Sequence, residues 1–308
     1  MGHFLTPQLV PQRLLLPSRC GGGCEDASVT VYLDGKQSQL ELGQTVVSHG
    51  IDRGLRELRG FPRSRGCRNA ATGRPDNGVV SEVPSVLVFD VNETLVDIES
   101  MAPLFGQIFG DTRVLREWFG QLVMYSMTAT LSGHYVDYFT LGQGLLRMLA
   151  DIHRADITDD DVRRVKEGML TMPAHPDVED ALTALRDNGF RLMTLTNSPP
   201  NPDGPTPLEH AGLDRFIERQ FSVDACRAYK PAPAVYRHVC HALEVAPVEC
   251  MMVAAHAWDT LGAQSAGFSS ALITRTGNAP LPVEGLPQPT LIANDLGELA
   301  GRLIESRA

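Results

Sequence analysis

A single carboxylate follows a strongly apolar run near residue 90. The segment 86–97 reads VLVFDVNETLVD, in which four apolar residues precede Asp90 and Thr94 follows it closely. A buried strand would deliver this carboxylate to its C-terminal edge, where open α/β sheets place their chemistry. An Asp there can attack an electrophilic carbon or phosphorus and form a covalent intermediate. A core strand followed by a helix cap explains the same residues, so this motif alone leaves both interpretations open.

Three further apolar segments also lead into residues that can do chemistry. These residues are Thr196, Asn197, Lys230, Tyr236, His256, Trp258 and Asp259. Each one taken alone has an ordinary structural interpretation, as a helix cap, a solvated side chain or a ring at the edge of the core. Four such groups in register at four strand ends favour a catalytic site over four coincidences.

The segments that must position these residues alternate between strand and helix. Strands are expected over 86–89, 191–196, 251–255, 271–274 and 290–293, and helices over 176–188, 233–243 and 296–304. This alternation predicts an α/β fold with a parallel sheet and helices on both faces. Residues 101–172 have little strand character, and the apolar positions within 114–123 follow a helical period. We expect them to form a helical cap over the edge of the sheet.

The N-terminal part has a different composition. Residues 1–85 contain ten Lys and Arg against eight Asp and Glu, whereas residues 86–308 contain 17 against 29. The Arg-rich stretch 53–74 lacks an apolar period and is expected to be disordered, while residues 29–42 alternate around Asp34-Gly35 and predict a hairpin. The predicted division is an irregular, largely disordered extension over 1–85, an α/β core over 86–99 and 173–308, and a cap over 100–172.

Composition limits the partners and the compartment. The 308 residues carry a formal net charge of −10, which argues against a nucleic-acid or anionic-membrane partner because phosphate contacts need a basic face. No apolar run approaches the roughly 18 residues that span a bilayer. The six cysteines lack the spacing of metal ligands and are expected to be free thiols in a reducing cytoplasm. We therefore expect a cytoplasmic protein that acts on a small molecule.

Taken together, these motifs resemble those of the haloacid dehalogenase (HAD) superfamily. The resemblance rests on the strings FDVNETLVD, LTNSP, YKPAPAVY and VAAHAWDTLGA and covers about 223 of the 308 residues. AWD followed by Gly-Ala, and a Tyr six residues after Lys230, resemble the type II, L-2-haloacid dehalogenase branch. The resemblance implies a Rossmann-like parallel sheet with an inserted helical cap, and a hydrolase that needs neither a metal nor another cofactor.

The resemblance also implies roles for individual residues. Asp90 would displace halide from C2 of a small 2-haloacid, and water activated by Asp259 would hydrolyse the resulting aspartyl ester. Lys230 would keep Asp90 ionised, and Thr94 would hydrogen-bond it. Substrate-binding residues would be Thr196, Asn197, Tyr236, Trp258, His256 and Phe119.

Three departures from the branch pattern concern the substrate. Phe119 stands where the branch has a cap arginine, Ala254 where it has a serine, and His256 where it has an asparagine. A protonated His256 would supply the missing positive charge and make activity sensitive to pH. A hydrogen-bonded, purely structural His256 is an equal alternative. Loss of the arginine weakens the anchoring of a small carboxylate, so a more apolar substrate is also compatible with the sequence.

Two other functions stay open at this point. Phosphatases of the superfamily have an acidic residue at the position of Asn92 and a metal-binding acid where this chain has Ala254-Ala255. An asparagine cannot act as a general acid, and losing one oxygen ligand weakens a magnesium site, whereas a halide leaving group needs neither. The alternatives are a Mg-dependent HAD phosphatase with an eroded metal site, and a non-catalytic HAD-fold binding protein. Cap-mediated homodimers are common in the branch, and a homodimer is a further expectation of the resemblance.

Overall fold

A computed structural model describes residues 28–33, 36–41, 83–202 and 204–307. The chain divides into two units, residues 1–78 and 79–308, which are described separately. In the first unit, β1 (Ser28–Leu33) pairs with β2 (Lys36–Glu41) in an antiparallel register. This pairing confirms the predicted hairpin. Its turn, and the stretch 53–74 that we expected to be disordered, lie outside the described residues.

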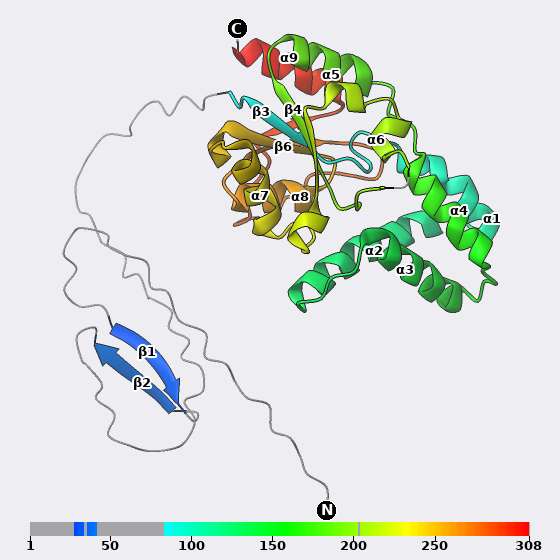
Figure 1. Ribbon diagram of the computed structural model, residues 1–308, viewed down its shortest axis with the longest axis horizontal. Helices are drawn as coiled ribbons and strands as arrows, with labels where there is room; N and C mark the ends of the chain where they lie inside the picture. Colours follow the sequence, from blue (N-terminus) through cyan, green and yellow to red (C-terminus); the bar gives the residue numbers. More distant parts are fainter. Residues whose placement is uncertain (1–27, 34–35, 42–82, 203, 308) are drawn as a thin grey trace, which may run out of the picture. The chain divides into compact units, whose positions relative to one another are not determined.

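A six-stranded parallel sheet lies at the centre of the second unit, in the order β5-β4-β3-β6-β7-β8 (Figure 1). The strands are β3 (Val86–Phe89), β4 (Arg191–Thr196), β5 (Arg219–Ser222), β6 (Cys250–Ala254), β7 (Ser269–Ile273) and β8 (Leu291–Ala293). Every residue of β3 and β6 is buried, as expected for strands covered on both faces. Because β3 pairs with both β4 and β6, it delivers Asp90 to the middle of the C-terminal edge.

Helices cover both faces of this sheet and confirm the predicted α/β class. Figure 1 shows α5 (Val178–Asp187) and α9 (Leu296–Arg307) together on one face, and α7 (Pro233–Leu243) and α8 (Ala257–Ser265) on the other. The short helical segments are α6 (Pro207–His210), η1 (Ile98–Met101), η2 (Asp214–Phe216), η3 (Val223–Cys226) and η4 (Pro247–Glu249).

Four helices are inserted between β3 and α5 and lie to one side of the sheet (Figure 1). They are α1 (Ala102–Phe109), α2 (Val114–Leu131), α3 (Tyr138–His153) and α4 (Asp159–Leu170). α2 buries Val114, Leu115, Trp118, Phe119 and Leu122, which is the face that the helical period predicted. The helical character of this segment is therefore confirmed, and its function as a cap stays a prediction.

The sequence prediction missed one strand and displaced several ends. β5 was not predicted because only Phe221 of its four residues is buried, so no apolar run marks it. β6 and β7 each begin and end one or two residues earlier than predicted, and α5 begins two residues later, at Val178. Thr196, Asn197 and His256 lie at or just after the ends of β4 and β6, as predicted, whereas Lys230 lies between η3 and α7 and not at a strand end.

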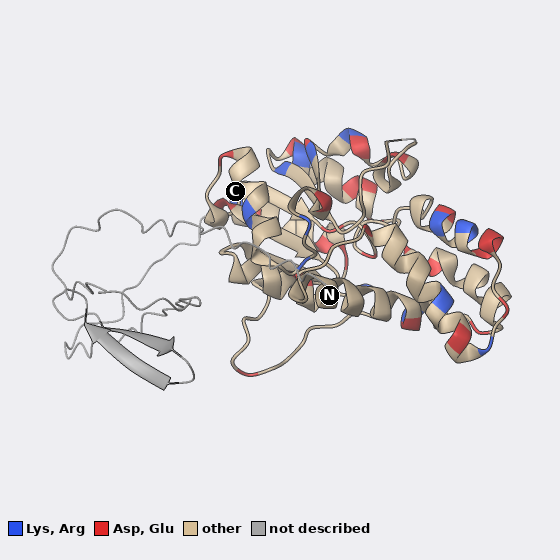
Figure 2. Ribbon diagram, turned by 60° about the horizontal axis from the view of Figure 1, so that its bottom comes forward, with Lys and Arg blue, Asp and Glu red and all other residues tan. Residues whose placement is uncertain are grey.

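The structure also bears on the surface charge, the cysteines and the possibility of a membrane span. Lys and Arg are scattered among Asp and Glu over the described part of the ribbon (Figure 2). Cys226, Cys240 and Cys250 are free thiols, as predicted, and the predicted free thiols of Cys20, Cys24 and Cys67 lie outside the described residues. Within the described ranges, no helix has both the length and the apolar character that crossing a membrane requires.

Close packing of α8 against the loop before α7 gives the first testable prediction. A Cβ added at Gly262 would lie 2.4 Å from Pro231 Cβ and 2.7 Å from the Tyr236 hydroxyl. We expect Gly262→Ala to lower the free energy of unfolding by about 1–3 kcal/mol, because overpacking forces neighbours apart. The matched control is Gly301→Ala on the exposed side of α9, where a Cβ has no neighbour within 4 Å and should stabilise the helix by up to about 1 kcal/mol. Urea unfolding of both variants measures these changes. Equal changes in the free energy of unfolding for the two variants would contradict the prediction.

Candidate active site

Asp90 is the centre of the polar residues at this sheet edge. It follows β3 directly, and only 4% of its surface is exposed. Its Oδ1 accepts a hydrogen bond from Lys230 Nζ at 2.7 Å, and its Oδ2 accepts one from Thr94 Oγ1 at 2.8 Å. Thr94 Oγ1 in turn accepts from the backbone N–H of Ala255 at 2.9 Å, so the end of β6 fixes the hydroxyl that orients Asp90. The structure thus brings the predicted residues Asp90, Thr94 and Lys230 into direct contact.

Lys230 joins two carboxylates in the interior. Its ammonium group donates to Asp259 Oδ2 at 2.6 Å and to the backbone oxygen of Leu195 at 2.9 Å, besides its bond to Asp90. Both Lys230 and Asp259 are fully buried. Tyr236 is fully buried as well, and its hydroxyl donates to Asp259 Oδ1 at 2.6 Å. Both oxygens of Asp259 therefore already have protein partners.

These contacts set the charges of the site. Burial alone would raise the pKa of Asp90, but the Lys230 cation and the hydrogen bond from His256 bring it well below its usual range. Burial likewise opposes the charge of Lys230, but the two carboxylates raise its pKa above the ordinary value. Asp90 is consequently an ionised carboxylate and Lys230 an ammonium group at neutral pH.

His256 lies on the other side of Asp90. It precedes α8, and its Nδ1 is 3.1 Å from Asp90 Oδ2 while its Nε2 is 2.6 Å from Glu93 Oε2. The Trp258 ring stacks on the imidazole with a centroid distance of 4.9 Å. The Phe119 ring of α2 lies 5.8 Å from it on centroids. The predicted residues Asp90, His256, Trp258 and Phe119 therefore meet here, together with Glu93, which was not predicted.

Two carboxylates determine the protonation of His256. Burial lowers the pKa of the imidazole, but the hydrogen bonds to Asp90 and Glu93 outweigh burial and raise the pKa to about 9. An imidazolium between two carboxylates is therefore the form that this site favours at neutral pH. That charge occupies the part of the site where the resemblance led us to expect a cap arginine.

The two residues at the end of β4 have smaller roles in the observed network. Thr196 Oγ1 accepts from the backbone N–H of Ser198 at 3.1 Å, and Asn197 Oδ1 accepts from the backbone N–H of Lys230 at 3.2 Å. Thr196 also lines a cavity of about 150 Å³ with Val91, Ser198 and Phe221. Asn197 thus holds the segment that carries Lys230, and substrate binding by these two residues stays a prediction.

Sequence reasoning missed the side chains of Glu93 and Arg116. The turn after Asp90 was considered as a source of backbone N–H groups, but Glu93 has a left-handed backbone with φ of 65°, and its carboxylate is buried against His256. Arg116 of α2 forms ion pairs with Glu93 and Glu99. The positive φ that sets Glu93 apart is seen only in the structure, so no signal in the sequence indicated the contacts of its side chain. Nothing in the sequence marked Arg116.

A magnesium ion does not fit this arrangement. In the described part of the chain, no three His, Cys, Asp or Glu side chains converge so that they could share a metal ion. Both oxygens of Asp90 already face positive groups or hydrogen-bond donors, and the ammonium group of Lys230 bridges Asp90 and Asp259. Magnesium needs several oxygen ligands in nearly octahedral geometry, and a bound cation would meet Lys230 and His256 at close range. No step of the chemistry below passes through a metal.

Comparison with known proteins identifies the family. The model of the haloacid dehalogenase-like hydrolases matches residues 84–267, which include every residue of the network around Asp90. The chain belongs to the haloacid dehalogenase-like hydrolase family. This HAD-like chain is 30% identical over 207 residues to (S)-2-haloacid dehalogenase 1 of Pseudomonas sp. (strain CBS-3), covering 65% of this chain and 88% of the relative. It is 29% identical over 196 residues to (S)-2-haloacid dehalogenase 4A of Burkholderia cepacia, covering 63% and 84%.

Solved structures give the same family. A crystal structure of a dehalogenase with an intermediate complex superposes with a TM-score of 0.65 at 27% sequence identity. The superposition covers 72% of this HAD-like chain and 98% of that protein. These findings confirm the predicted fold and the resemblance from which the site residues were inferred.

The raised pKa of His256 makes a prediction about stability. Because the folded protein holds this proton up to about pH 9 and the unfolded chain releases it near pH 6.5, stability from this group is fully present below pH 6.5 and is lost as pH rises through 9. We expect the free energy of unfolding to fall by up to about 3 kcal/mol over that interval in the wild type and not in His256→Gln. Urea unfolding at several pH values measures both proteins. If the free energy of unfolding had the same pH dependence in the wild type and in His256→Gln, His256 would not hold a proton up to about pH 9 in the folded protein.

Proposed function

We propose that this chain is a metal-independent 2-haloacid dehalogenase, a hydrolase that acts on carbon–halogen bonds. The observation that carries the proposal is the state of Asp90: a buried, ionised carboxylate at a strand end, held by Lys230, Thr94 and His256. The named relatives, which are (S)-2-haloacid dehalogenases, support the same reaction.

In the first step, Asp90 displaces halide from C2 of a small 2-haloacid with inversion, and an ester forms on Asp90. The contacts to Lys230 and Thr94 fix the direction of the carboxylate, and the poorly solvated site leaves it reactive. The leaving halide departs as an anion and takes no proton. The side chain of Asn92, which cannot act as a general acid, is therefore compatible with this step.

His256 is our candidate for the positive charge that the absent arginine would supply. Its imidazolium adjoins Asp90, and Phe119 and Trp258 place aromatic rings beside it. The charge would attract the carboxylate of the substrate, while the rings exclude water. Thr196 and Asn197 are kept as candidates for further contacts with that carboxylate.

In the second step, water attacks the ester carbonyl and regenerates Asp90, so that the overall reaction converts the haloacid and water into a hydroxy acid, halide and one proton. Asp259 is the base that the resemblance implies, but it is fully buried and both its oxygens accept hydrogen bonds from Lys230 and Tyr236. This geometry favours a positioning role for Asp259 and Tyr236.

His256 is better placed to accept the proton of the attacking water. Esterification removes the negative charge of Asp90, which is one of the two carboxylates that raise the pKa of the imidazole. Its pKa therefore falls when the ester forms, and the imidazolium releases one proton to solvent, which is the proton of the overall reaction. The neutral ring then accepts a proton from the attacking water, and His256 is an imidazolium again when Asp90 is regenerated. Glu93 keeps the ring oriented through Nε2.

The two alternative functions are less well supported. A Mg-dependent phosphatase would need oxygen ligands where the site has Lys230, His256 and two alanines. A non-catalytic binding protein would have no use for the pairing of Asp90 with Lys230, because an ion pair buried this deeply is costly to form. The experiment below distinguishes all three.

We expect the full chain to release halide from L-2-chloropropionate in the presence of a chelator, and Asp90→Asn to lower the rate by at least about a thousandfold. The amide is not a nucleophile of comparable strength. The matched control is Asp180→Asn on the exposed face of α5, which should leave the rate unchanged. Release that persists in Asp90→Asn would contradict the assignment of the nucleophile. Activity on phosphate esters that chelation abolishes would favour the phosphatase.

We also propose that the chain forms a homodimer through the inserted helices. Leu131 at the end of α2 is 89% exposed, and Met124 and Val136 nearby in the chain are 48% and 46% exposed. Exposed large apolar side chains gathered on one segment are typical of an interaction surface. We expect light scattering to give twice the mass of one chain, and Leu131→Glu to give the single mass. A wild-type monomer would contradict this.

A further inference from the structure

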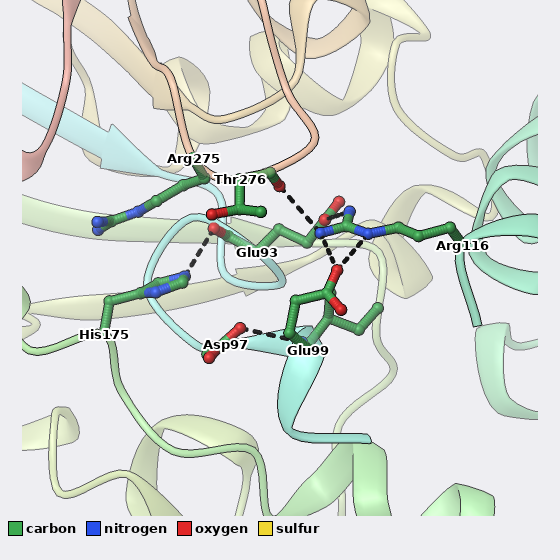
Figure 3. Close-up of a pocket in the computed structure, with 8 residues that line it drawn as sticks. Glu93, Asp97, Glu99, Arg116, His175, Arg275 and Thr276 are labelled. Carbon is green, nitrogen blue, oxygen red and sulfur yellow. Dashed lines mark hydrogen bonds and ion pairs between the residues drawn. The ribbon is translucent and has the colours of Figure 1, made fainter. Parts of the chain in front are cut away.

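Arg116 links the inserted helices to the turn that follows Asp90. It lies on α2, and its guanidinium group forms ion pairs with Glu93 and Glu99 while Nη2 donates to the backbone oxygen of Thr276 at 2.9 Å. These groups line a cavity of about 160 Å³, into which Arg116 projects from the opposite side to Arg275 and His175 (Figure 3). One arginine side chain of α2 therefore contacts two other segments that are far apart in the sequence, residues 93–99 and the loop at Thr276.

Glu93 is shared between this arginine and the candidate base. Its Oε2 lies 2.6 Å from His256 Nε2, and its Oε1 faces Arg116, with the Asn278 amide at 3.4 Å. The Glu93 side chain is 4% exposed, and its backbone adopts a φ of 65° that a non-glycine residue holds only when its surroundings fix it. The contacts of the carboxylate are therefore part of what holds this turn.

The charges alternate along a continuous line of contacts, from Asp90 to His256, Glu93 and Arg116. We propose that Arg116 is a positioning residue that sets the proton affinity of His256 through Glu93, and this proposal rests on the proposed function of the chain. Arg116 neutralises part of the charge that Glu93 presents to the imidazole, so that His256 releases its proton more readily. Because Arg116 belongs to the inserted helices, this effect is complete only when α2 lies against the core.

The other charged groups around His256 and Glu93 do not contact the Glu93 carboxylate in the way that Arg116 does. The charged groups in contact with the imidazole are Asp90 and Glu93, and its other neighbours, Phe119 and Trp258, are uncharged rings. On the other side of the turn, His175 Nε2 contacts the backbone oxygen of Glu93, and Arg275 donates to the backbone oxygen of Thr94 while it pairs with Asp177. Lys230 lies beyond Asp90. Within the described ranges, Arg116 is thus the cation that contacts the Glu93 carboxylate besides His256 itself.

Two variants move this effect in opposite directions. Arg116→Met removes the cation, and we expect the pKa of His256 to rise by about one unit, as expected for a unit charge at this range in a partly polarisable interior. Glu99→Gln removes the second carboxylate that competes for Arg116, and the pKa of His256 should fall by a few tenths of a unit. Arg116→Lys keeps a cation and should restore most of the wild-type value. Arg113→Met is the matched control, since this arginine near the start of α2 has an 88% exposed side chain and, among the residues that the structure describes, pairs only with Asp111.

Two readouts separate this proposal from the proposed function. Titration of the His256 imidazole by NMR in the full, histidine-labelled chain, assigned with His256→Gln, reports the pKa whether or not the protein is active. In the active enzyme, the midpoint of the pH profile for ester hydrolysis should shift in the same direction as the NMR value. A merely structural Arg116 would lower stability or rate without moving either midpoint.

The outcome that overturns the proposal is an unchanged His256 titration in Arg116→Met or, if that variant does not fold, in Glu99→Gln. Absence of halide release with the expected NMR shifts would overturn the proposed function and leave the coupling of Arg116 to His256 in place. A shift of the His256 pKa in Arg113→Met as large as that in Arg116→Met would also contradict the role of Arg116. It would show that the pKa follows the net charge of the protein and not the contact with Glu93.

Discussion

The buried contact between Lys230 and two carboxylates is the constraint on which the rest of the site depends. Bringing three charges into the interior is costly unless each one finds partners at short range. Lys230 Nζ meets Asp90 at 2.7 Å, Asp259 at 2.6 Å and the backbone oxygen of Leu195 at 2.9 Å. Removing a charged partner would leave a charge uncompensated, so the end of β3, the loop before α7 and the first turn of α8 must keep their places relative to one another. The parallel sheet meets this requirement because β3, β4 and β6 end at one edge.

The contact of His256 with Asp90 and Glu93 distinguishes this site from the pattern that the resemblance implies. Where the resemblance led us to expect an arginine, an uncharged Phe119 lies beside an imidazolium held between Asp90 and Glu93. A histidine differs from an arginine because its charge depends on its surroundings within the physiological pH range. The same side chain can thus attract an anionic substrate as an imidazolium in one step. Once the ester has neutralised Asp90, it can release that proton to solvent and accept one from the attacking water in the next step.

Much of this arrangement was predictable from the sequence, because strand ends in a parallel sheet meet. Asp90, Lys230 and Asp259 were predicted to come together at the edge of the sheet, and Lys230 contacts both carboxylates, although it lies in the loop before α7 and not at a strand end. The partners of Glu93 and Arg116 were not predictable in the same way. Glu93 contacts His256 from 163 positions away, and Arg116 is one of two charged residues on α2, next to Glu117. Such contacts depend on three-dimensional placement, which no local pattern encodes. The cytoplasmic location stays a prediction from the cysteine usage.

The central claim is that Asp90 forms a covalent ester, and a single-turnover reaction in water labelled with heavy oxygen tests it most directly. With enzyme in excess over L-2-chloropropionate, the ester mechanism transfers an oxygen of Asp90 to the product and leaves the label from water in the Asp90 carboxylate. Mass spectrometry should find an unlabelled hydroxyl group in the product and a labelled Asp90 peptide. A labelled product with an unlabelled Asp90 would show that water attacks the substrate directly and would contradict the mechanism.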